Sequence, residues 1–99
     1  MARLPPGRSE KRSAAAVAVM LTSPDPGFPT EMTLTQDISS RGARVVTKGL
    51  WRPSDSLVIK SLEGGLYSEA QVIYRQPISK NVYAIGLKLI APQGNWRGK

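Results

Sequence analysis

The sequence predicts an all-β fold, in which six short antiparallel strands either close into a barrel or stack as a sandwich. Apolar segments alternate along the chain with turns rich in Gly and Pro, and the last segment repeats with a period of two residues. The chain has 99 residues, of which 40% are hydrophobic, and this is enough for one small domain with one core. The expected strands cover residues 13–22, 31–39, 43–48, 56–62, 66–75 and 82–90.

The first segment, 13–22, is ambiguous on local grounds. Its run of alanines also suits a helix with Ser13 as the N-cap, but the surrounding β pattern favours a strand. The second segment, 31–39, alternates except at Gln36. The residues expected to face the core are Met32, Leu34 and Ile38, and those expected to face outward are Thr33, Thr35, Asp37 and Ser39.

The later segments predict hairpins. Gly64 and Gly65 join two β-favouring runs, 57–59 and 72–74, and residues 76–81 supply the next turn. In the last strand the period of two places one set of residues on one face, Tyr83, Ile85, Leu87 and Leu89, and the other set on the opposite face, Val82, Ala84, Gly86 and Lys88.

The two ends of the chain predict little regular structure. Two prolines and a glycine in residues 1–7 indicate a disordered lead-in. Two glycines in the tail, 92–99, argue against a stable terminal helix.

The composition excludes several kinds of chemistry. The chain has no Cys and no His, which removes thiol nucleophiles, disulfides, Cys/His zinc sites and imidazole acid–base catalysis. Its seven carboxylates are scattered, and it has no Walker loop, so we expect neither an enzyme nor a metal or other cofactor. The net charge of +7 favours a phosphate-bearing partner.

No apolar run reaches the roughly 18 residues that a membrane helix needs, so we expect no membrane insertion. A basic stretch precedes the apolar residues 14–21, as in a secretory signal, but no A-x-A cleavage site follows. We therefore expect a cytoplasmic protein.

Two short motifs carry the functional information. Arg8-x-x-x-Arg12 is common by chance in a chain with eight Arg, whereas Asp37-x-Ser39-x-x-Gly42 is rare. An arginine fork binds phosphate oxygens or the O6 and N7 edge of guanine. A carboxylate accepts from the N–H groups of guanine, a serine hydroxyl donates and accepts, and glycine permits a positive φ and a close backbone approach. Together these groups suit a phosphorylated ligand that carries guanine.

Each motif also has a simpler interpretation. An Asp-x-Ser turn often caps its own backbone, and two arginines in a polar lead-in are often only solvated. Arg41 and Arg44 flank the second motif and could add phosphate contacts or lie in solvent. Trp51 and Trp96 could stack on a base or cap an end of the barrel.

With these motifs the sequence resembles the PilZ domain, the bacterial receptor module for cyclic di-GMP. The resemblance rests on residues 8–12 (Arg-Ser-Glu-Lys-Arg), 37–42 (Asp-Ile-Ser-Ser-Arg-Gly) and the closing strand 83–89 (Tyr-Ala-Ile-Gly-Leu-Lys-Leu). It implies a six-stranded antiparallel barrel over residues 8–91, with 13–22 as a strand. The sequence differs from many members of the family at Gly7, where a basic or bulky residue is common. Many members also have a helix after the barrel, for which the seven residues after Pro92 leave too little room.

The resemblance also implies a binding mode. Arg8 and Arg12 would grip phosphates and guanine edges from a mobile N-terminal arm that the ligand orders. Asp37 and Ser39 would read a guanine, and Gly42 would shape the loop between the strands. With no output domain in 99 residues, the signal would pass to an unidentified protein partner.

Two other functions stay open from the sequence. A small basic barrel could bind single-stranded nucleic acid, although six aromatic residues in 99 give no visible stacking ladder. A PilZ-type barrel could also serve as a protein-interaction adaptor without a ligand. We favour the cyclic di-GMP receptor, as a monomer or weak dimer, and do not expect a polynucleotide partner.

Overall fold

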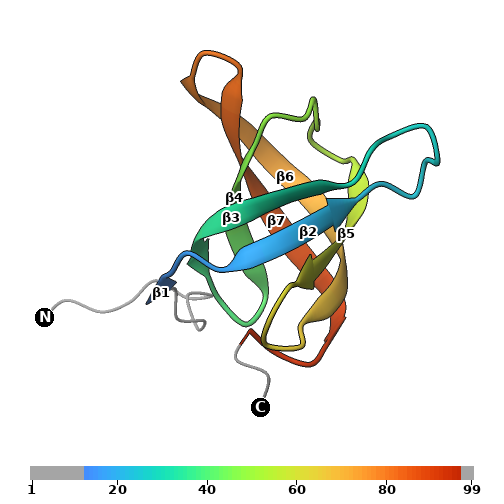
Figure 1. The fold of residues 1–99 in the computed structure, drawn as a ribbon, viewed down its shortest axis with the longest axis vertical. Coiled ribbons are helices and arrows are strands. Elements are labelled where there is room, and N and C mark those ends of the chain that lie inside the picture. Colours follow the sequence, from blue (N-terminus) through green and yellow to red (C-terminus); the bar gives the residue numbers. More distant parts are fainter. Residues whose placement is uncertain (1–12, 97–99) are drawn as a thin grey trace, which may run out of the picture.

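The computed structural model describes residues 13–96, and all of their regular structure is β, with no helix in that range. Six strands close into an antiparallel barrel in the order β2, β3, β4, β7, β6, β5 and back to β2, while the short β1 adds to β3 (Figure 1). The all-β prediction is confirmed, and the barrel replaces the sandwich alternative. The strands are β1 (Ser13–Ala14), β2 (Ala18–Thr22), β3 (Glu31–Ile38), β4 (Gly42–Thr47), β5 (Ser56–Ser61), β6 (Tyr67–Ser79) and β7 (Val82–Gln93).

The alanine-rich segment 13–22 is extended, so the helix alternative is wrong. It forms β1 and β2, which both pair with β3 and are separated by three residues. The buried Thr35 of β3 spans this break, because its hydroxyl donates to the carbonyl of Ala15 over 2.5 Å and accepts from the N–H of Val17 over 2.8 Å. Two backbone hydrogen bonds also cross the break, from the Ala15 N–H to the Gln36 carbonyl over 3.3 Å and from the Thr35 N–H to the Val17 carbonyl over 3.0 Å. The hydroxyl therefore adds to the backbone pairing there.

The core fills the barrel with aliphatic side chains that alternate along the strands. Val19 and Leu21 of β2, Val45 of β4, Ile59 of β5 and Ile85 of β7 are each completely buried. Full burial of such a side chain is worth about 1.5–3 kcal/mol. Because neighbouring strands supply these residues at matching heights, the period of two in the sequence is enough to fill the interior.

The predicted faces of β3 are wrong over its first half. Met32 and Leu34 are 65% and 50% exposed, whereas Thr35 is buried. A β-bulge between Thr35 and Asp37 shifts the register against β4, and the extra residue reverses the alternation. Ile38 lies in the core as predicted. The prediction continued its alternation back past the bulge, and for this reason it assigned the preceding residues to the wrong faces. Gln36, the residue that broke the alternation, is the bulge residue.

The two later hairpins differ in how well the sequence predicts them. Gly64 and Gly65 both adopt positive φ between β5 and β6, so this turn is confirmed. The predicted turn at 76–81 is shorter than expected, because β6 continues to Ser79 and only two residues connect it to β7. Asn81 takes the positive φ of 61° there, a conformation that Asn tolerates. Pro77 is accepted in β6 because the pairing with β5 ends at Gln71, so its missing N–H faces no neighbouring strand.

Candidate functional site

The motif Asp37-x-Ser39-x-x-Gly42 forms the turn between β3 and β4, which we call the corner. The N–H of Ser39 donates to the carbonyl of Gly42 over 2.9 Å, and the N–H of Arg41 donates to Ser39 Oγ over 3.3 Å. The serine thus caps its own turn, and only 4% of it is exposed. The expectation that Ser39 faces outward is wrong, because these turn contacts draw it inward. Its part in ligand binding stays a prediction.

The other two residues of the motif flank this turn. Asp37 lies on the outer side of the barrel as expected, because the next residue, Ile38, points into the core. Its cross-strand partner on β4 is Arg44, so opposite charges stand side by side on the outer face. Gly42 begins β4 opposite Lys88. Gly42 does not adopt the positive φ that the sequence allowed. Of the two expected uses of this glycine, only the close approach of a ligand to a backbone without a side chain stays a prediction.

The beginning of the described chain lies against the corner. Ser13 pairs with Ile38, and Ala14 pairs with Asp37 (Figure 1). Arg8 and Arg12 lie outside the described residues, so their expected contacts with a ligand stay predictions. The arm that carries them nevertheless joins the barrel beside the acidic residue of the motif.

A polar cluster on the outer face adjoins the corner. Arg44 donates from Nε to Gln36 Oε1 over 2.7 Å, and from its two terminal nitrogens to the hydroxyl of Tyr74 over 3.0 Å and to Gln76 Oε1 over 2.8 Å. Its Cζ also lies 5.7 Å from the centre of the Tyr74 ring. Gly86 stands between Arg44 and Tyr74 in the register, and the ring covers it so closely that a Cβ there would lie 2.2 Å from a ring carbon.

The hydrogen bonds of this cluster fix the position of the Arg44 side chain, which the sequence left open between phosphate contact and solvent. A guanidinium has five N–H donors, and the cluster engages three of them. Within residues 13–96 the other two have no acceptor. The position of the guanidinium is fixed in advance, which lowers the entropy cost of holding an anion. The partners of Arg44 were missed from the sequence, because the register that brings β3, β4, β6 and β7 together has no local signal. Arg41 is exposed at the turn itself.

The two tryptophans cap opposite ends of the barrel, which is the simpler of their two predicted roles. Trp96 packs against the core and its indole N–H donates to the carbonyl of Ser39 over 2.7 Å. It therefore holds the corner from the C-terminal side. Trp51 is 5% exposed and belongs to the core cluster.

Residues 13–96 hold neither a metal-binding cluster nor a membrane-spanning helix. Among them no three His, Cys, Asp or Glu side chains gather as a metal ion would need. The same residues include no helix with the length and apolar character to cross a membrane.

The fold and the site together define the protein as a small six-stranded barrel with a polar corner. Comparison with known proteins finds a solved structure with a similar fold. Neither the models of protein families nor the curated proteins include a match to the chain. Among solved structures, the chain is similar to the inhibitor of motility of Bacillus subtilis (MotI/DgrA), with a TM-score of 0.68 and 20% sequence identity. The match covers 85% of this chain and 42% of the neighbour. The two proteins share the barrel fold, and this chain spans less than half of the neighbour's length.

Proposed function

We propose that the chain is a PilZ-type receptor for cyclic di-GMP that acts as an adaptor toward a protein partner. In this proposal Arg8 and Arg12 bind the phosphates and guanine edges of the ligand. Asp37 accepts from a guanine, Ser39 and Gly42 shape the corner, and Arg44 with the exposed Arg41 adds positive charge. The protein works in the bacterial cytoplasm, as a monomer or weak dimer and without enzymatic activity.

The observation that carries the proposal is the pairing of Ser13 with Ile38. Arg12 directly precedes Ser13, and Arg8 is five residues before it, so chain length alone keeps Arg8 within about 17 Å of Ser13. Both arginines can therefore reach the corner. An arm that started at the other end of the barrel could not bring them there.

An aromatic ring and a cation on the outer face beside the corner support the proposal. Tyr74 is 38% exposed and offers an aromatic surface to a base, while Arg44 keeps two donors for an anion. The solved neighbour is named as an inhibitor, which is in keeping with an adaptor that acts on another protein. Its whole length is more than twice that of the matched part.

Isothermal titration calorimetry with cyclic di-GMP tests the proposal directly. Micromolar binding corresponds to about −8 kcal/mol, and removing one arginine from a desolvated charge contact costs about 2–5 kcal/mol. Arg8→Ala and Arg12→Ala should therefore weaken binding to the limit of detection. Lys11→Ala is the matched control, because it removes the same charge from the same arm and should leave the affinity nearly unchanged.

Three outcomes would count against the proposal. Parent-like binding by both arginine variants would overturn the assignment of these residues. An absence of any binding heat would favour the adaptor without a ligand. Tight binding of single-stranded nucleic acid with a steep loss on adding salt would favour the polynucleotide alternative, because a two-phosphate ligand releases few counterions.

A further inference from the structure

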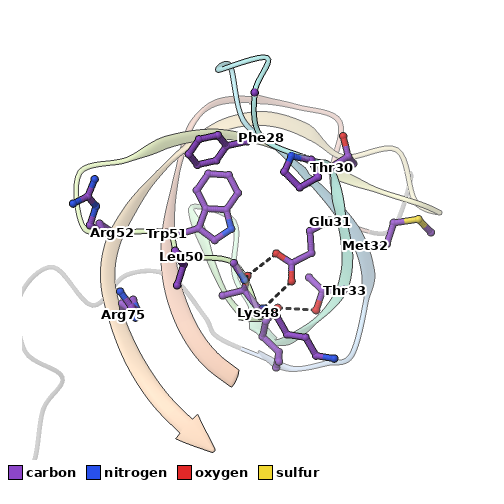
Figure 2. A pocket seen from close by; sticks show the side chains of 15 residues that line it. Phe28, Thr30, Glu31, Met32, Thr33, Lys48, Leu50, Trp51, Arg52 and Arg75 are labelled. Atoms are coloured by element: carbon purple, nitrogen blue, oxygen red, sulfur yellow. Dashed lines mark hydrogen bonds between the residues drawn. The ribbon is translucent and has the colours of Figure 1, made fainter. Parts of the chain in front are cut away.

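A second surface lies at the end of the barrel where β3 begins, away from the corner. Here a pocket of about 1080 Å³ opens between the loops at residues 24–30 and 48–52 (Figure 2). Phe28, Met32 and Leu50 line it and are 52%, 65% and 72% exposed. Apolar side chains gathered around one hollow mark a surface that binds another molecule. We call this hollow the end pocket.

Trp51 adds an unpaired hydrogen-bond donor to the wall of the end pocket. Its indole N–H is buried and has no acceptor in the part of the chain that the structure describes. The indole nitrogen lies beside Gly49, where a Cβ would come within 2.9 Å of it, and the ring of Phe28 covers the indole at 6.4 Å between centroids. A buried indole N–H usually finds a partner. Because this nitrogen is closed to solvent, an acceptor on a bound chain reaches it only when the wall of the end pocket shifts.

The charged residues around the end pocket are mostly positive. Lys48, Arg52 and Arg75 line it, and no ion pair within residues 13–96 neutralises them. Arg75 is held with its Cζ 4.1 Å from the centre of the Tyr83 ring. The carboxylate of Glu31 is already engaged, since it accepts from the Thr47 hydroxyl over 2.6 Å and from the backbone N–H of Lys48 over 2.9 Å.

We propose that the end pocket docks an acidic peptide segment of a partner protein, with a bulky apolar side chain seated against Phe28 and Leu50. The three cations supply the charge complementarity, and the apolar rim supplies the anchor site. This proposal deepens the adaptor role given above and rests on it. β3 runs about 23 Å from Glu31 to Ile38, so a segment in the end pocket leaves the corner open to its own ligand.

NMR titration of the ¹⁵N-labelled protein tests the end pocket without cyclic di-GMP, so its result is independent of ligand binding at the corner. The probe is a synthetic peptide with Asp and Glu around a central Phe-Leu pair. We expect shifts in the backbone signals of residues 27–33 and 46–52 and in the indole signal of Trp51. A peptide with Lys in place of the acids, and one with Ala in place of Phe-Leu, should bind much more weakly.

Surface variants of the protein provide the matching test. Arg52→Glu and Leu50→Ser change exposed side chains, so the barrel should remain folded, and each should weaken the acidic peptide about tenfold. Lys60→Glu is the matched control, because it reverses an exposed charge on β5 outside the end pocket and should leave binding unchanged.

Several results would overturn the proposal. One is an equal affinity for all three peptides. Another is a set of chemical-shift changes confined to the corner. A third is an equal loss of peptide affinity in Arg52→Glu and Lys60→Glu. Binding to vesicles of phosphatidylglycerol in place of the peptide would assign the pocket to a membrane surface. Concentration-dependent association that Leu50→Ser abolishes would assign it to a second copy of the chain.

Discussion

Gly86 tests whether the polar cluster on the outer face works as a unit. In Gly86→Ala the new Cβ would lie 2.2 Å from a ring carbon of Tyr74, so the exposed ring must swing away. The displacement breaks the hydrogen bond from Arg44 to the tyrosine hydroxyl, worth about 1 kcal/mol, and the cation–π contact, worth about 0.5–1 kcal/mol at an exposed site. Gly86 does not have a positive φ, so alanine also stabilises by about 0.4–1 kcal/mol through the unfolded chain. We expect a net loss of about 1 kcal/mol.

A double-mutant cycle measures the coupling in urea denaturation followed by tryptophan fluorescence. In a Tyr74→Ala background no ring lies over Gly86, so the same Gly86→Ala change should stabilise the fold by about 0.5 kcal/mol. The coupling energy is then about 1.5 kcal/mol. Equal effects of Gly86→Ala in the two backgrounds would refute the reasoning, because the cost would then arise in the backbone and not in the ring.

Three further predictions concern the break between β1 and β2, the contact of Gly94 with the β5–β6 turn, and the contact of Trp96 with the corner. Thr35→Val removes a buried hydroxyl that makes two hydrogen bonds and should cost about 2–3 kcal/mol in urea denaturation, whereas Thr35→Ser should retain most of the stability; parent-like stability of the valine variant would contradict the bridging role. Gly94→Ala places a Cβ 2.1 Å from the carbonyl oxygen of Gly65 at a φ of +72°, and should lower the free energy of unfolding by at least about 2 kcal/mol; an unchanged melting temperature would argue against it. Trp96→Phe loses the hydrogen bond to the Ser39 carbonyl, so we expect the free energy of unfolding to fall by about 1 kcal/mol. Calorimetry should also show weaker binding of cyclic di-GMP. An unchanged affinity would show that this contact does not position the corner.

Much of the fold could be predicted because the strands follow local rules. Leu57 and Ile59 belong to a run that favours β structure, Ile85 alternates with small residues, and glycines mark the β5–β6 turn. Sequence pattern alone therefore places these strands. The first half of β3 could not be predicted in this way. There a bulge inverts the faces and threonine hydroxyls, which bond to backbone carbonyls at Ala15 and Val46, take the inward positions that apolar residues were expected to fill.

The candidate site could be predicted only in part. The motif at the corner was visible because its residues are close in sequence, although turn bonding places Ser39 inside. The cluster around Arg44 depends on a register across several strands, and the end pocket depends on how two loops meet. Neither arrangement leaves a periodic signal, because the residues that meet come from different strands or loops, and Arg44 and Tyr74 are 30 positions apart.

The two ends of the described chain are fastened to the same turn, Ser13 through the pairing of β1 with Ile38 and Trp96 through the Ser39 carbonyl. A mechanical load applied between residues 13 and 96 therefore acts on the two-residue β1 and on the contacts of Trp96 with the corner and the core, before it reaches the main ladders of the barrel. Within residues 13–96 the corner is thus among the first parts to bear tension between the two ends. A ligand bound at the corner would add contacts that resist this load, and its binding would be measurable as a higher unfolding force in an optical trap.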